Sequence, residues 1–213
     1  ADQVIAIDVP LGVNADLALE VTSAPAALPA SGSTIGQMTA EGIAGSFGLA
    51  AGSSSLFSVA PDGTLRVTGA LGVNQTHQLD VTFSAFGFNQ TERLQVRTGS
   101  TVNDAIAGSA GDDLIYALSG ADVVNGGTGD DVLFGQAGND QLFGGDGRDV
   151  LVGGANNDQI QGGGGDDVIL RGWADGTDAV NGGDGTDRLR ITGTTANETL
   201  TATWNGTAGT ALT

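Results

Sequence analysis

Aspartate recurs at nine-residue intervals through the second half of this 213-residue sequence, two positions before an aliphatic residue. Eight copies of a nine-residue unit run from Gly99 to Leu170 without a gap. Two more follow a two-residue slip at Arg171-Gly172, and a divergent copy follows a second slip at Ile191-Thr192. The sixth positions of the first ten copies are Asp104, Asp113, Asp122, Asp131, Asp140, Asp149, Asp158, Asp167, Asp178 and Asp187. Hard divalent cations prefer carboxylate oxygens, so this column is a candidate set of metal ligands.

Three further columns indicate that the array is folded. The eighth position is aliphatic in all eleven copies, and a flexible Gly/Asp-rich linker has no reason to keep such a residue in register. The fourth position is Gly in eight copies and Asn156 in another; both residue types tolerate positive φ, so each copy can turn sharply there. The first position is Gly in nine copies, which lets main-chain carbonyls approach a shared ligand.

Stacking these copies requires positive charge between the aspartates. Adjacent strands lie about 4.8 Å apart, and two carboxylates at that spacing repel by roughly 3 kcal/mol at an effective dielectric of about 20. Several such pairs approach the whole stability of a domain, about 5–15 kcal/mol. No basic residue recurs in the unit, so a bound cation must neutralise the column. Calcium suits these oxygens better than magnesium, which keeps its waters and a regular octahedron.

The unit resembles the nonapeptide GGxGxDxUx of the RTX (hemolysin-type) calcium-binding family over about residues 99–201. The resemblance implies a parallel β-roll in which six residues turn, three form a strand, and two copies complete a coil. It implies calcium between stacked turns, with Asp104, Asp122, Asp140 and Asp158 on one edge and Asp113, Asp131, Asp149 and Asp167 on the other. It also implies type I secretion to the extracellular space or the bacterial cell surface.

The ends of the array depart from the pattern. Val102 and Ala196 replace Gly at the fourth position of the first and last copies, and terminal repeats commonly act as caps. We expect poor or absent calcium binding there, and an interruption of the ion row at the slip before Trp173. Residues 202–213 are expected to be a tail or a capping strand.

Composition narrows the function. The net charge is −18 at pH 7, with seven basic residues, which argues against nucleic acid and anionic membranes as partners. Residues 99–213 hold seventeen acids and four Arg, and therefore carry most of that charge. The sequence has no Cys and no apolar run long enough to span a membrane.

Residues 1–98 predict a separate all-β domain, a β-sandwich of the cadherin or immunoglobulin type. Apolar and polar residues alternate in segments such as Leu79–Phe83, and Pro61-Asp62-Gly63 predicts a hairpin turn. Residues 34–98 resemble a bacterial cadherin-like domain. Asn74 and Asn89 stand near the places where that family has acidic calcium ligands, so we assign no metal to this half.

One sheet of the expected roll carries an apolar outer face. Strand side chains alternate, so the seventh and ninth positions point outward where the eighth points inward. In the even-numbered copies these outward residues are Leu114, Tyr116, Val132, Phe134, Val150, Val152, Val168 and Leu170. A face of this size exceeds what a monomer normally exposes. We expect it to be covered by the N-terminal domain, by the tail with Trp204, or by a second copy of the chain.

No arrangement of residues indicates catalysis. His77 is the only histidine, and a solvent-facing role suits it better than a place in a Ser-His-Asp triad. Pairs such as Asp130-Asp131 combine the aspartate column with a variable fifth position. The sequence thus predicts a non-catalytic, calcium-binding structural or adhesive module, for example of a surface layer, that folds on reaching extracellular calcium while residues 1–98 fold without it. Alternatives are a polysaccharide-binding lectin using Phe86 and Phe88, or an accessory region of a larger secreted enzyme.

Overall fold

The computed structural model describes residues 8–11, 15–21, 27–40, 43, 45–85, 88–172 and 175–192, and everything below concerns these residues. They form three sheets and contain no helix, as the all-β prediction requires. No helix long and apolar enough to cross a membrane is found among them. Trp173, Phe86 and residues 193–213, with Ala196 and Trp204, lie outside the described residues.

The N-terminal strands form two layers. One is a five-stranded antiparallel sheet in the order β1-β2-β3-β6-β5; the strands are β1 (Asp8–Leu11), β2 (Ala15–Val21), β3 (Thr34–Ala40), β5 (Phe57–Val59) and β6 (Thr64–Val67). The other layer contains β4 (Ser46–Leu49), β7 (Gln75–Ala85) and β8 (Phe88–Ser100). Gly63, at φ 92°, completes the turn between β5 and β6, so the predicted hairpin is confirmed.

The nine-residue units form a parallel β-roll, which confirms the predicted fold of this half. Odd-numbered copies supply β9 (Ala105–Ala107), β11 (Val123–Thr128), β13 (Gln141–Asp146), β15 (Gln159–Gly164) and β17 (Ala179–Asp184). Even-numbered copies supply β10 (Asp113–Leu118), β12 (Val132–Ala137), β14 (Val150–Ala155), β16 (Val168–Gly172) and β18 (Arg188–Thr192). Aliphatic eighth positions from both sheets, such as Leu133, Leu142 and Leu151, meet in a fully buried core.

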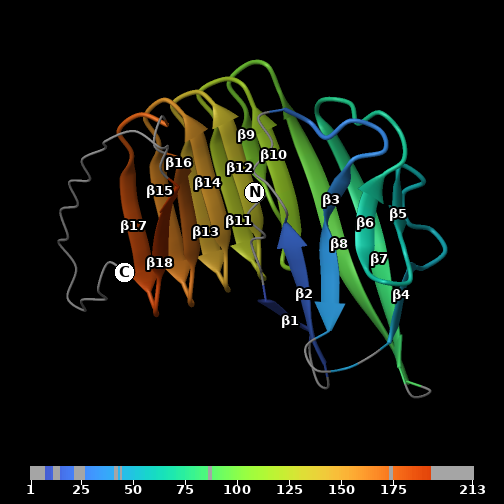
Figure 1. The fold of residues 1–213 in the computed structure, drawn as a ribbon. Coiled ribbons are helices and arrows are strands. Elements are labelled where there is room, and N and C mark those ends of the chain that lie inside the picture. Colours follow the sequence, from blue (N-terminus) through green and yellow to red (C-terminus); the bar gives the residue numbers. More distant parts are fainter. Residues whose placement is uncertain are drawn as a thin grey trace.

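The sheet of the even-numbered copies continues into the N-terminal half. β10 pairs in parallel with β8, and the result is one eight-stranded sheet in the order β18-β16-β14-β12-β10-β8-β7-β4 (Figure 1). The boundary predicted between residues 98 and 99 lies inside β8. Both halves therefore share a strand, and division of the chain into two domains remains a prediction.

The apolar outer face of the roll is buried inside the chain. Leu114, Tyr116, Val132, Phe134, Val150 and Val152 are at most 7% exposed and belong to one core with residues of the N-terminal sheet such as Ile35, Met38 and Leu65. Val168 and Leu170 are partly buried against the same core. The first expected covering partner, the N-terminal half, is thus confirmed. Self-association through these eight residues is not supported, because the chain already covers them.

Candidate metal-binding rows

From the third copy to the eighth, and again in the tenth, the turns of the roll have left-handed backbone at two positions of the unit. The fourth position was predicted, and Asn156 adopts it at φ 82° alongside glycines such as Gly129 and Gly147. The second position was not predicted. Leu118 and Gln136 occupy it with φ angles of 85° and 72°, and the glycines at the same position of other copies also have positive φ. The frequent Gly at this position in the sequence was the available indication.

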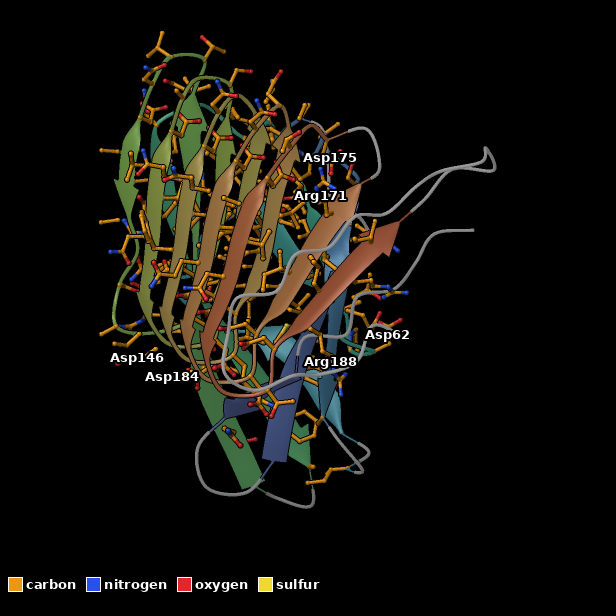
Figure 2. All side chains as sticks on the ribbon, turned by 90° about the vertical axis from the view of Figure 1, so that its left-hand side faces the viewer. Asp62, Asp146, Arg171, Asp175, Asp184 and Arg188 are labelled. Carbon is orange, nitrogen blue, oxygen red and sulfur yellow. The ribbon has the colours of Figure 1, made fainter. Side chains whose placement is uncertain are left out.

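The ten column aspartates form two rows, with the pairing that the resemblance implied. In each row the main-chain N–H of one aspartate donates to Oδ1 of the aspartate one coil later, over 2.8–3.1 Å. One row is Asp104, Asp122, Asp140, Asp158 and Asp178; the other is Asp113, Asp131, Asp149, Asp167 and Asp187. The rows run along opposite edges, with Asp146 and Asp184 near one edge and Arg171 and Asp175 near the other (Figure 2).

The slip at Arg171-Gly172 does not break these rows. β15 pairs with β17 and β16 with β18 at an offset of 20 residues, in place of the 18 found elsewhere. The last coil absorbs the two extra residues, and Asp158 N–H still reaches Asp178 Oδ1 at 3.0 Å. The expected interruption is therefore not seen in the hydrogen-bond ladder.

The interior of both rows contains buried carboxylate oxygens without a hydrogen-bond donor. They are the Oδ2 atoms of Asp122, Asp131, Asp140, Asp149, Asp158 and Asp167. A buried, unpaired charged oxygen is strongly unfavourable. Each of these six atoms therefore requires a positively charged partner or a proton.

Glycine at the first position brings a carbonyl oxygen beside four of these atoms, the Oδ2 atoms of Asp131, Asp140, Asp149 and Asp167. A Cβ built on Gly144 would lie 2.2 Å from Asp149 Oδ2 and 2.5 Å from Gly162 O of the next coil. At Gly135 the corresponding distances, to Asp140 Oδ2 and Gly153 O, are both 2.5 Å. Any side chain here would displace the two oxygens. The first-position glycine thus keeps a carboxylate oxygen and a carbonyl oxygen together, as predicted.

Burial dominates the electrostatics of the rows. It raises the pKa of Asp131 to about 8, of Asp149 and Asp158 to about 7, and of Asp140 and Asp167 to about 6. The pKa of Asp122 is raised for the same reason. Each pKa unit corresponds to about 1.4 kcal/mol. Even one unit at each of five carboxylates would amount to about 7 kcal/mol, within the range of a domain's whole stability.

The donor set fits calcium. Among the described residues no three His, Cys, Asp or Glu side chains gather in one group, so main-chain carbonyls must complete any metal site. Carboxylate and carbonyl oxygens in a flexible arrangement suit Ca²⁺, whereas zinc and copper favour nitrogen or sulfur ligands. The donors along the rows are all oxygens. Asp122, Asp131, Asp140, Asp149, Asp158 and Asp167 are the strongest ligand candidates.

The fifth position has a structural role that the sequence did not reveal. Where it is Asn or Asp, its Oδ1 accepts the main-chain N–H of the fifth residue one coil later, as from Asp130 to Asp112 at 2.9 Å and from Asn157 to Asn139 at 3.0 Å. Asp166 accepts in the same way from Thr186. The Asp-Asp pairs thus combine two ladders, and only their second member lies in the buried row.

The surroundings of His77 match no catalytic triad. Its Nδ1 lies 3.3 Å from Ser54 Oγ, and its Nε2 lies 3.2 Å from Gln75 Oε1. An amide oxygen therefore occupies the place that a triad gives to a carboxylate. Burial lowers the pKa of His77, so its ring is largely neutral at pH 7.

Comparison with known proteins agrees with this geometry. The family model of the RTX calcium-binding nonapeptide repeat matches residues 98–133, 118–151 and 143–173. These segments contain the six aspartates with unpartnered Oδ2 atoms. No curated protein matches the chain.

Proposed function

We propose that this chain, whose residues 98–173 carry RTX calcium-binding nonapeptide repeats and bind calcium at several sites, is a secreted, non-catalytic structural module that completes its folding on extracellular calcium. The observation that carries the proposal is the pair of rows with six buried, unpartnered carboxylate oxygens. Such rows are unfavourable when bare, and they become favourable once a divalent cation neutralises them.

Each calcium ion is proposed to bind between neighbouring turns of one edge. The carboxylates of Asp122, Asp140 and Asp158 serve one edge, and those of Asp131, Asp149 and Asp167 serve the other. First-position carbonyls such as Gly153 O and Gly162 O, which lie beside these carboxylates, supply further ligands. The ion contributes the charge that neutralises the row, and the chain contributes the fixed spacing of its oxygens.

The proposed location follows from the linkage between binding and folding. A ligand that binds only the folded state stabilises it in proportion to the logarithm of its concentration. Calcium is scarce in the cytosol and abundant outside cells, so the same chain would be largely unfolded before export and folded after it. A surface or adhesive role is part of this proposal, since the roll is a stiff element whose outer face is already anchored to the N-terminal layer.

The alternatives receive less support from the described residues. The lectin hypothesis depends on Phe86, which lies outside them, and on Phe88, whose side chain is not described. An accessory role in a larger secreted enzyme is compatible with the same roll. The resemblance of residues 34–98 to a cadherin-like domain stays a prediction, and it adds no metal ligand.

A calcium titration of the full chain tests the proposal. Circular dichroism should show a cooperative gain of β-structure with calcium and little change with the same concentration of magnesium. Isothermal titration should report several ions per chain. The proposal is wrong if the chain reaches the same spectrum and melting temperature in a chelator as in millimolar calcium.

A further inference from the structure

The Oδ2 atoms of the first aspartates in the two rows have hydrogen-bond donors that the interior Oδ2 atoms lack. In the six interior copies whose Oδ2 is unpartnered, the second residue has positive φ: Leu118, Gly127, Gln136, Gly145, Gly154 and Gly163. In the first two copies the second residue is Ser, without positive φ. Ser109 donates both its N–H and its Oγ–H to Asp113 Oδ2, each over 2.7 Å, and Ser100 does the same for Asp104. A serine of the chain thus supplies the hydrogen-bond donors for the first carboxylate of each row.

The last carboxylate of one row forms an ion pair with an arginine. Arg171 Nε lies 2.6 Å from Asp178 Oδ2, and the two side chains are only 19% and 2% exposed. Arg171 Nη2 also donates to Gly176 O, the fourth-position carbonyl of the same turn. One guanidinium therefore contacts a column carboxylate and a turn carbonyl, the combination of oxygens that a calcium ion needs.

The two-residue insertion makes this contact possible. In the regular copies, strands such as β12 and β14 run on through the first three residues of the next copy before the turn. After Leu170 the strand β16 instead ends with the two inserted residues, Arg171 and Gly172, and Asp175 accepts the N–H of Gly172. The inserted Arg171 therefore lies at the row edge, beside the turn with Asp175 (Figure 2). The insertion therefore adds a cation at the position where the row would otherwise continue.

We propose that Arg171 is a built-in substitute for calcium, which ends the row of Asp104, Asp122, Asp140, Asp158 and Asp178 by occupying the terminal cation position at Asp178. This inference rests on the proposed calcium binding of the interior copies. Arg97, which donates from Nε to Asp113 Oδ1 at 3.1 Å, neutralises the first carboxylate of the other row in a related way. The chain thus sets the number of ions by placing its own donors at row ends.

The test compares ion counts by native mass spectrometry and isothermal titration for four full-length proteins. Arg171→Ala should bind one calcium ion more than the wild type, because the terminal position becomes open. Arg171→Ala/Asp178→Asn should return to the wild-type count. Arg190→Ala removes an exposed arginine of β18 with the same change in net charge, and it should also keep the wild-type count.

Stability provides a second measurement. In a chelator, Arg171→Ala should melt at a lower temperature than Arg190→Ala, and added calcium should remove most of this difference. An unchanged ion count in Arg171→Ala, or an equal gain in Arg190→Ala, would overturn the inference while leaving the proposed function intact. A wild type without calcium binding would instead refute the proposed function. Should Arg171→Ala stay unfolded at all calcium concentrations, Arg171→Lys decides, because retained positive charge must keep the wild-type count and a higher count overturns the inference.

Discussion

Replacing Asp149 by Asn should change stability in opposite directions with and without calcium. Asp149 is buried in the middle of its row; its Oδ1 accepts the N–H of Asp131 at 2.8 Å, and its Oδ2 has no hydrogen-bond donor. Asparagine keeps the Oδ1 acceptor and nearly the same volume. The substitution therefore removes one buried charge and leaves the ladder in place.

Without calcium, Asp149→Asn should stabilise the chain at pH 8. Burial raises the pKa of Asp149 from 3.8 to about 7, so the ionised carboxylate makes the folded state unfavourable above that pH. At about 1.4 kcal/mol per pKa unit, ionisation costs about 4 kcal/mol. Asparagine places an amide N–H group where Oδ2 stood, and each amide hydrogen left there without an acceptor carries a penalty of roughly 1–3 kcal/mol. A net gain of about 1–3 kcal/mol is expected.

With calcium, the same variant should be less stable than the wild type. A site occupied at a calcium concentration 100 times its Kd contributes about 2.7 kcal/mol to folding. Asp149→Asn removes a proposed ligand and with it most of that contribution. The variant should also bind at least one ion fewer in isothermal titration.

Urea unfolding at pH 8, in a chelator and in millimolar calcium, measures the change in the free energy of unfolding under both conditions. The matched control is Asp146→Asn, which removes an exposed carboxylate from the same turn and gives the same change in net charge. It should shift stability by less than about 0.5 kcal/mol in both conditions. If Asp149→Asn destabilises the chain to the same extent in chelator and in calcium, the carboxylate serves only packing, and the assignment of the row to calcium fails.

Three further outcomes follow from the same geometry. The carboxylates of Asp131, Asp149 and Asp158 have pKa values raised to about 7–8, so the calcium-free chain should lose stability as the pH rises from 5 to 8, whereas calcium affinity should increase over this range. Thermal melts over this pH range in a chelator check the first outcome, and melts at fixed calcium check the second. Gly144→Ala should destabilise the calcium-bound chain by about 1–3 kcal/mol, because the new Cβ meets Asp149 Oδ2 and Gly162 O. Gly111→Ala, with nothing within 4 Å of its Cβ, should change the stability by less than 1 kcal/mol, and equal effects of the two variants in urea unfolding would contradict this. Phe134→Lys should lower protection from hydrogen exchange in β3 and β6 as well as in β12, because Phe134 is 1% exposed in the core that joins the roll to the N-terminal sheet; protection lost in β12 alone would show that the two halves are independent.

The nine-residue period was sufficient to predict a folded array with an anionic column and an aliphatic column, whereas the roll and its two edges were predicted from the resemblance to the RTX nonapeptide. In that family two copies complete a coil, so the resemblance implied that identical positions stack after two copies into aspartate rows and an aliphatic core. The left-handed second position was harder to predict. Positive φ favours glycine, as at Gly127 and Gly145, but Leu118 and Gln136 adopt it too, so the residue types at this position do not form a uniform column. The ladder at the fifth position was missed for a similar reason, since Ala121 and Arg148 interrupt its pattern.

The junction between the halves could not be predicted from periodicity. Pairing of β8 with β10 joins a non-repetitive strand to a repetitive one, and nothing in the alternation of Leu94, Gln95 and Val96 selects that neighbour. The burial of the apolar outer face was predictable, because Tyr116 and Phe134 are too large and too regular to be left in water. Which element covers them depends on long-range packing, which only the three-dimensional structure contains.

The shared sheet and core indicate that calcium binding affects the stability of the N-terminal half as well as that of the roll. The N-terminal half was expected to fold without calcium, yet Val96 of β8 and Leu114 of β10 are paired neighbours and are both fully buried in one core with Leu65 and Val67. A calcium-free roll that loses β10, β12 and β14 would expose the apolar side chains of the N-terminal sheet that pack on them. The exposed area would disfavour a folded N-terminal sheet beside an unfolded roll. Calcium bound at the proposed edge sites would therefore also stabilise strands that contain none of its ligands.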